Sequence, residues 1–174
     1  MIERERKYRI AEADLSRLAG LLDAAAALER REVQDTVHFR DGTGRLDGLN
    51  LRVRAIGALR ELTVKGPRLE GGRSKVREEH TVVVEGDLAP LFEALALYPA
   101  ERYRKRTAIY RFGQALVSLD QVDDVGAFCE IEADDDATID LVAARLGLAD
   151  EAVEPRGYAR LVRSVRDDRV GEVK

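Results

Sequence analysis

Several short segments of the chain alternate apolar with charged residues, and this alternation is the strongest constraint on its fold. In residues 51–54, LRVR, the leucine and valine would face one side of a strand and both arginines the other, because side chains of a β-strand point to opposite faces with period two. The pattern recurs in LTVK, VSLD and CEIE, and in KVREE Val76 lies opposite Arg77 and Glu79. In RYRKR the three arginines share one face, opposite Tyr103 and Lys105. The sequence therefore predicts a sheet with one apolar face and one face of arginine, lysine, glutamate and aspartate.

Turn residues separate these strands. Asp41-Gly42-Thr43-Gly44 follows one of them and Gly71-Gly72 precedes another, and such clusters favour turns. The expected strands are residues 2–10, 33–40, 48–57, 59–67, 74–85, 102–112, 115–122 and 126–134, and the expected helices are residues 13–30, 87–98, 136–146 and 157–166. Many strands joined by tight turns, with few helices, predict an α+β protein built on an antiparallel sheet or barrel.

Length and charge narrow the class of protein. A chain of 174 residues suits one domain over residues 1–174. Its 29 basic and 33 acidic residues give a net charge of −4, which argues against a nucleic-acid partner held by bulk electrostatics. A single cysteine, Cys129, excludes an internal disulfide framework. The chain shows no signal peptide and no apolar run long enough to span a bilayer, so we expect a soluble cytoplasmic protein without a membrane partner.

The charged faces have two interpretations. An ordinary antiparallel sheet exposes its polar face to water. Here, however, acids and bases are segregated on different strands. The basic set is Arg52, Arg54, Lys65, Arg104 and Arg106, and the acidic set is Glu3, Glu5, Glu130 and Glu132. A sheet closed with this face inward would form a tunnel with a cationic wall and an acidic wall.

Such a tunnel has a chemical use. Arginine forks and lysine point charges bind polyphosphates, whereas carboxylates bind Mg²⁺ or Mn²⁺, which commonly bridge to substrate phosphates. The N-terminal stretch ERERK fits this interpretation, because Glu3, Glu5 and Lys7 would share one face of a strand. The pattern alone leaves two interpretations of the five charges at the N-terminus open, a solvated chain end and the metal-binding edge of a tunnel.

Seven stretches together resemble the CYTH family, which contains class IV adenylyl cyclases, thiamine triphosphatases and inorganic triphosphatases. They are ExExK at residues 3–7, GLNLRVR, LTVKGP, the R-x-E of Arg77 and Glu79, the YRKR strand, VSLDQVDDVGAFCEIE and RGYARLV. The resemblance implies an eight-stranded antiparallel β-barrel that forms a charged tunnel with flanking helices. It also implies Mg²⁺ or Mn²⁺ as cofactor and a small-molecule triphosphate or nucleotide as substrate.

The resemblance implies a role for each matching charge. The metal-side set is Glu3, Glu5, Glu79, Asp120, Glu130 and Glu132. Within it, Glu79 and Asp120 match charged tunnel positions either as ion-pair organisers or as metal neighbours, as Arg77 does. The resemblance thus favours the metal-binding edge as the interpretation of the five N-terminal charges. The phosphate-binding set is Lys7, Arg52, Arg54, Lys65, Arg77, Arg104 and Arg106. The catalytic set is Glu3, Glu5, Lys7, Arg52, Arg54, Lys65 and Arg106. Lys105 lies between Arg104 and Arg106, and a shift of one residue in the strand register would place Lys105 in the tunnel instead of them. Of the two arginines, Arg106 is the preferred tunnel residue.

Some positions depart from the family's pattern. An aromatic residue often follows the aspartate of the QDT strand, where this chain has Val37, His38 and Phe39, and the late Lys-Ser-Tyr is replaced by residues 156–158, RGY. These positions bear on substrate preference. From the residues alone, His38 and His80 are expected to be surface or packing residues, and Cys129 a small buried hydrophobe.

The predicted activity is metal-dependent hydrolysis of a triphosphate. The same tunnel would serve an adenylyl cyclase, which forms cyclic AMP and pyrophosphate from ATP, or a non-catalytic binder of polyphosphates or nucleotides. A P-loop is excluded, because no GxxxxGK[ST] occurs. The sequence leaves open the substrate, the choice of metal and whether the chain forms a homodimer.

Overall fold

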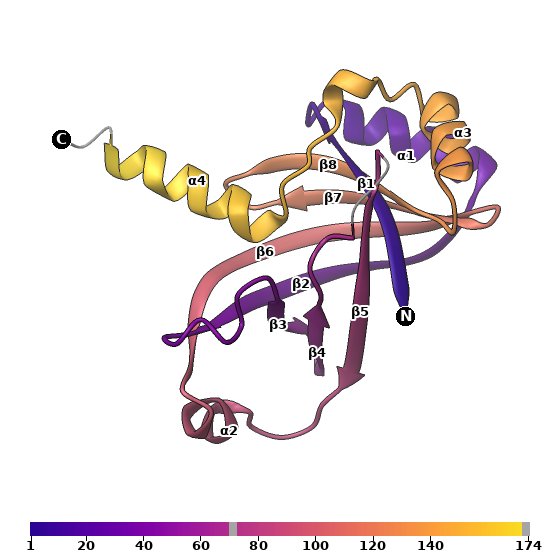
Figure 1. Cartoon of the computed structure of the whole chain (residues 1–174). Helices are drawn as coiled ribbons and strands as arrows, with labels where there is room; N and C mark the ends of the chain where they lie inside the picture. The colour runs from indigo at the N-terminus through magenta and orange to yellow at the C-terminus, as the bar shows by residue number, and fades with distance from the viewer. Residues whose placement is uncertain (70–72, 172–174) are drawn as a thin grey trace.

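Eight antiparallel strands close into a barrel in the computed structural model, which describes residues 1–69 and 73–171 (Figure 1). The strands are β1 Ile2–Ile10, β2 Ala27–Asp41, β3 Asn50–Ile56, β4 Leu59–Lys65, β5 Lys75–Val83, β6 Leu97–Phe112, β7 Ala115–Val122 and β8 Gly126–Glu132. Their order around the barrel is β1-β5-β4-β3-β2-β6-β7-β8, and β8 closes onto β1. The predicted antiparallel barrel is confirmed, while the expected Gly71-Gly72 turn lies outside the described residues.

Four helices flank the barrel within the described residues. They are α1 Asp14–Ala25, α2 Ala89–Ala94, α3 Asp136–Leu146 and α4 Tyr158–Gly171, and a short 3-10 turn, η1, spans Asp150–Ala152. Asp135 caps the N-terminus of α3, because its side chain accepts a hydrogen bond from the Thr138 backbone N–H at 2.7 Å. Gly147 caps the C-terminus with a φ of 67°, which suits glycine. No helix in the described ranges is long and apolar enough to cross a membrane.

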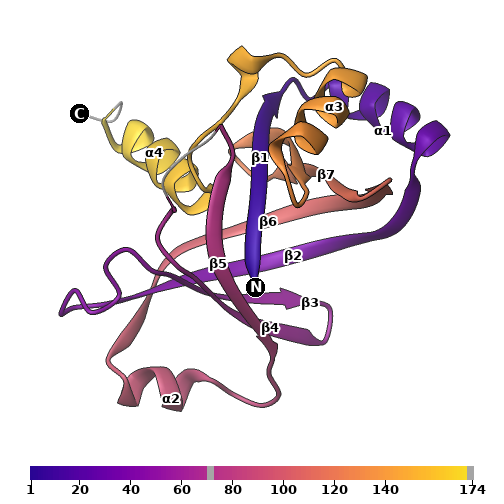
Figure 2. The same cartoon turned by 45° about the vertical axis from the view of Figure 1, so that its right-hand side comes forward.

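Helices α1 and α3 lie beside each other against the outside of the barrel, near β1, β7 and β8 (Figures 1 and 2). Leu18 and Leu22 of α1 and Ile139 of α3 pack with outward-facing residues of the barrel wall in one buried cluster. Cys129 belongs to this cluster, as predicted. The apolar core therefore lies between barrel and helices, which leaves the barrel interior available for polar side chains.

Helix α4 packs at one end of the barrel (Figure 2). Its residues Tyr158 and Leu161 form a second buried cluster with Tyr103, Val122 and Phe128, which come from β6, β7 and β8. This cluster closes part of the barrel interior beside the charged residues described below.

Two boundaries differ from those predicted. Residues 27–30 were expected to end the first helix, but they begin β2, and β6 begins at Leu97 within the expected second helix. The cause is long-range pairing, because β2 and β6 are joined from Ala27 opposite Arg111 to Asp41 opposite Leu97. The hydrogen bonds of this long pair outweigh the local helix preference of ALERRE.

Candidate active site: a charged tunnel

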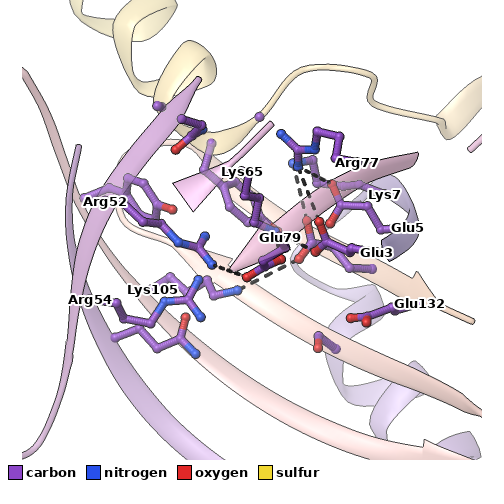
Figure 3. Close-up of a pocket in the computed structure, with 18 of the residues that line it drawn as sticks. Glu3, Glu5, Lys7, Arg52, Arg54, Lys65, Arg77, Glu79, Lys105 and Glu132 are labelled. Carbon is purple, nitrogen blue, oxygen red and sulfur yellow. Dashed lines mark hydrogen bonds and ion pairs between the residues drawn. The ribbon is translucent and has the colours of Figure 1, made fainter. Parts of the chain in front are cut away.

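A cavity of about 200 Å³ lies inside the barrel and is lined mainly by charged side chains (Figure 3). Directly opposite residues of an antiparallel pair share a face, so the pairings of Glu3 with Arg77 and of Lys7 with Glu130 bring predicted residues together on the inner face. The predicted residues that line the cavity are Glu3, Glu5, Lys7, Arg52, Arg54, Lys65, Arg77, Glu79, Glu130 and Glu132. The sequence prediction of an inward charged face is therefore confirmed for these strands.

Lys65 connects two of the carboxylates. Its Nζ donates to Glu3 Oε1 at 2.6 Å and lies 2.7 Å from Glu79 Oε2. Burial, together with the neighbouring charge of Glu5, raises the pKa of Glu3 to about 7. Glu79 is also 3.7 Å from the Arg52 guanidinium, and although its own burial opposes ionisation, Lys65 lowers its pKa. Of these two carboxylates, Glu3 is thus the one whose negative charge is less well compensated.

Glu5 differs from Glu3 in that its negative charge is well compensated by cations. Lys75 Nζ lies 3.2 Å and Arg77 Nη2 3.4 Å from its Oε1. Burial alone would raise the pKa of Glu5, but the surrounding cations, Lys75 first among them, hold it well below its usual range. Lys75 was not predicted, although it precedes Arg77 by two residues and so shares its face. The spacing of two residues between Lys75 and Arg77 was the signal in the sequence that could have placed Lys75 beside Glu5.

Lys7 lies deeper, against the cluster at the end of the barrel. Its Nζ is 3.4 Å from Glu130 Oε1 and 3.8 Å from the centroid of the Tyr158 ring, a cation–π contact. Burial lowers the pKa of Lys7, and Glu130 opposes that shift. Tyr158 therefore forms part of the tunnel wall, a role that the sequence did not assign to it.

Lys105, Asp120 and Tyr158 form a buried polar triad. Lys105 Nζ and the Tyr158 hydroxyl both donate to Asp120 Oδ2, at 2.8 Å and 2.6 Å. Asp120 has an exposed fraction of 0% and does not line the cavity. It was predicted as an ion-pair organiser or a metal neighbour, and its pairing with Lys105 behind the cavity wall fits the first of these roles.

The predicted tunnel positions of Arg104 and Arg106 are wrong. Arg104 lies on the outside of the barrel 3.5 Å from Asp35, and Arg106 lies outside 2.8 Å from Asp123. The inner face of β6 instead consists of Tyr103, Lys105, Thr107 and Ile109, all of them buried. The β2 register sets this choice, since Gln34, which lines the cavity, is opposite Lys105.

A family model for the CYTH domain matches residues 1–158. The chain belongs to the CYTH family. The comparison with curated proteins gave no match.

Solved structures share the CYTH fold. The chain is similar to the PH1012 protein of Pyrococcus horikoshii, with 28% identity, a TM-score of 0.74, and coverage of 92% of this chain and 99% of that one. A conserved hypothetical protein from Pyrococcus furiosus has 26% identity, a TM-score of 0.75 and the same coverage. HpAC1 from Hippeastrum, described as a putative adenylyl cyclase with a dominant triphosphatase activity, has 15% identity, a TM-score of 0.73, and coverage of 94% and 95%.

The acidic side of this CYTH tunnel has the donor chemistry for a divalent cation. In the part of the chain that the structure describes, no three His, Cys, Asp or Glu side chains are already grouped to hold a metal ion. Instead, the lysines and arginines of the tunnel pair with Glu3, Glu5, Glu79 and Glu130. Glu3 Oε2, however, is buried without a hydrogen-bond partner among the described residues. Burial and then the charge of Glu5 raise the pKa of Glu3. A cation beside Glu3 and Glu5 would offset both effects, so oxygen donors and charge both fit Mg²⁺ or Mn²⁺.

A neutral stripe lies across the tunnel from β1. In the closed order of the strands β2 is four positions away from β1 in either direction, and its Gln34, Thr36 and His38 are buried side chains with unpartnered polar atoms among the described residues. Burial, followed by the charge of Arg52, lowers the pKa of His38 to about 4, so the imidazole is neutral near pH 7. His38 was expected to be a surface or packing residue. His38 comes four residues after Gln34, so both share one face of the strand, and this spacing was the signal in the sequence for its place in the tunnel.

Proposed function

We propose that the chain is a divalent-metal-dependent triphosphatase that hydrolyses a triphosphate held inside the barrel. The observation that carries this proposal is the meeting of cations and carboxylates in one enclosed cavity, with Arg52 and Arg54 on β3 and Glu3 and Glu5 on β1. A triphosphate needs the cations, and a metal ion that neutralises its reacting end needs the carboxylates.

Arg52 and Arg54 would bind the phosphates that do not react. The Nε atoms of both are buried without a partner among the described residues, and Arg54 is only loosely paired, 4.0 Å from Glu61. Their guanidinium groups therefore have donors left for phosphate oxygens, which they bind as planar forks. Because phosphoryl transfer needs mainly positioning and charge neutralisation, fixed cations of this kind contribute directly to the rate.

Glu3 and Glu5 would hold the metal, with Glu130 and Glu132 beside them on β8. Bound Mg²⁺ or Mn²⁺ would supply Lewis-acid stabilisation of phosphate charge and lower the pKa of an attacking water. Lys65 lies between Glu3 and Glu79, so its ammonium can turn from Glu3 to a phosphate oxygen while Glu79 continues to orient it. Lys7 and Lys105 add positive charge at the closed end of the tunnel.

Two rival functions share the same cavity. An adenylyl cyclase would use the bound phosphates of ATP, and a pure binder would use only the cations. The activity described for HpAC1 favours hydrolysis, since that protein has the same fold and its dominant activity is that of a triphosphatase. The glutamates favour an enzyme over a binder, because binding alone does not need an acidic wall.

Product analysis tests the proposal. The purified protein is incubated with inorganic triphosphate, thiamine triphosphate or ATP, each with Mg²⁺ or Mn²⁺, beside a Glu3→Gln/Glu5→Gln variant. We expect orthophosphate from the wild type and not from the variant. Cyclic AMP with pyrophosphate would overturn hydrolysis in favour of cyclisation, and tight binding without any product would leave only a binder.

A further inference from the structure

A second, smaller cavity of about 160 Å³ adjoins the tunnel, and the two share His38, Asn50 and Ala159 as lining residues. We call it the side cavity. It lies where β2 ends and β3 begins, and the loop between these strands and the first turn of α4 line its other sides. His38 and Asn50 therefore lie at the junction of two spaces, only one of which has been assigned a function above.

His38 is fixed at this junction by packing. Its side chain is 7% exposed, and its ring stacks on Tyr103 with centroids 5.7 Å apart and planes at 28°. The Nε2 atom of His38 and the Oδ1 atom of Asn50 are both buried, and neither makes a hydrogen bond of normal geometry in the described part of the chain. The Asn50 side chain nevertheless lies near enough to the imidazole to oppose the lowering of its pKa by burial. Such atoms are costly to bury unless something completes their hydrogen bonds, so this pair points to a ligand.

The charge of the wall changes at these two residues. Along the inner face of β3 the side chains run from Arg54 through Arg52 to Asn50, from cationic to neutral. Across the register, His38 is opposite Arg52, and it is itself uncharged near pH 7 because burial lowers its pKa to about 4. Arg52 is therefore the last cation along the inner face of β3, and the next residue on that face, Asn50, is uncharged.

The side cavity beyond the junction does not suit another phosphate. Its cation, Arg40, is 3.5 Å from the buried Glu101 carboxylate. Asp41 and Asp47, the other charged residues that line it among those described, are acids. A fourth phosphate placed here would meet carboxylates and an arginine that is already paired, whereas an uncharged group would not be repelled.

We propose that His38 and Asn50 are specificity-determining residues that end the phosphate-binding part of the tunnel and hydrogen-bond to the group attached to the last phosphate. The ligand class is a triphosphate monoester with an uncharged, hydroxyl-bearing substituent such as a sugar, which is preferred to a chain of four phosphates. This inference rests on the proposed triphosphatase function.

Kinetics with three substrates test it. Values of kcat/KM are measured for inorganic triphosphate, inorganic tetraphosphate and ATP in the wild type, in His38→Phe and in His80→Phe. The phenylalanine at residue 38 keeps a ring on Tyr103 and removes the nitrogens, while His80 is exposed on β5 and serves as the matched control. We expect the ratio of ATP to inorganic triphosphate to fall about tenfold in His38→Phe, as the loss of one buried hydrogen bond allows, and to stay unchanged in His80→Phe. Wild-type tetraphosphate hydrolysis should be slower than that of ATP.

Ring NMR gives an independent readout, because the chain has only two histidines. The Hε1 signal of His38 is identified by its loss in His38→Phe and followed on addition of a non-hydrolysable ATP analogue without metal. We expect that signal to move with the analogue and to move much less with inorganic triphosphate, while the His80 signal stays still.

The outcomes separate the two proposals. Hydrolysis of inorganic triphosphate, combined with an unchanged ATP ratio in His38→Phe or a wild-type preference for tetraphosphate, overturns the specificity role and leaves the triphosphatase intact. If the wild type hydrolyses no triphosphate, the proposed function fails, and the NMR titration still decides the binding role. Equal movement of the His38 signal with both ligands would overturn that role.

Discussion

The two faces of strand β6 place similar charges in different surroundings. Lys105 lies inside the barrel, 5% exposed, with its Nζ 2.8 Å from Asp120. Arg104 and Arg106 lie outside, with side chains 56% and 57% exposed. An enclosed pair interacts in a medium of low polarity and depends on both partners, whereas an exposed pair is screened by water and contributes little. Enclosure, more than the kind of charge, determines what each residue can do.

Strand β1 adds a third environment. Lys7 faces the tunnel, while its neighbour Arg6 faces outward and is nevertheless buried, bonded to Asp136 and Asp140 of α3. The outer face is thus divided into a part covered by helices and a part open to water. We expect inner charges to govern chemistry, covered outer charges to govern stability, and open outer charges to affect neither.

Glu3→Gln should have the largest effect on catalysis. The substitution removes a proposed metal ligand, so kcat should fall by about 10²–10³-fold. Stability should hardly change, because burial and Glu5 already disfavour the charge of Glu3 and raise its pKa to about 7, and Lys65 keeps Glu79 at 2.7 Å. Phosphate release and thermal unfolding measure the two effects. Activity close to wild type would contradict a metal role for Glu3.

Lys105→Met should impair both activity and folding. The substitution leaves the fully buried Asp120 with only the Tyr158 hydroxyl as a donor to its Oδ2, and an uncompensated buried charge costs about 3–5 kcal/mol of unfolding free energy. Denaturant unfolding measures the loss. A stability close to that of the wild type would show that Asp120 does not depend on Lys105.

The double variant Lys105→Met/Asp120→Asn separates the two effects. Neutralising Asp120 should recover most of the lost stability, because no buried charge remains unpaired. Activity should stay low, because the tunnel still lacks the ammonium of Lys105. Full recovery of both would mean that Lys105 acts on structure alone.

The sequence was sufficient to predict the barrel and most of its inner face. On β3 and β8 charged residues alternate with apolar ones, so period-two alternation indicates which residues face inward. On β1 both faces carry charge, and the resemblance of ExExK to the family's pattern selected the inward set. Glu5, Lys7 and Glu130 line the cavity as predicted.

The same reasoning failed where alternation carried no information. Strand β6 has cations on both faces, so RYRKR does not indicate whether Lys105 or Arg106 faces inward; pairing with β2 decides it. The place of His38 in the tunnel was not predicted, because the inner face of β2 carries no charged pattern. A neutral polar residue between Val37 and Phe39 gives the same sequence pattern whether it lines a tunnel or packs in a core. Both failures concern side-chain direction, which local sequence determines only when the two faces differ.

Arg6→Met tests the covered part of the outer face. Arg6 donates to Ser74, Asp136 and Asp140 and is 2% exposed. Its loss should cost about 2 kcal/mol of stability, less than the loss of Lys105, because both aspartates are partly exposed and can be rehydrated. Denaturant unfolding and kcat are measured together. A fall in kcat without a loss of stability would show that covered outer charges also act on the chemistry.

Arg104→Gln and Arg106→Gln should have the smallest effects. Each removes one exposed ion pair, with Asp35 or with Asp123, so stability should change by less than about 0.5 kcal/mol. Values of kcat/KM should stay within about twofold of wild type, because neither guanidinium reaches the tunnel and distant exposed charges are screened by salt. Kinetics at low and high ionic strength distinguish a local role from long-range attraction of the substrate. A tenfold loss of kcat/KM in Arg106→Gln that does not depend on salt would mean that β6 in solution is shifted by one residue. Arg106 would then face the inside of the barrel and Lys105 the outside, the reverse of their orientation in the structure.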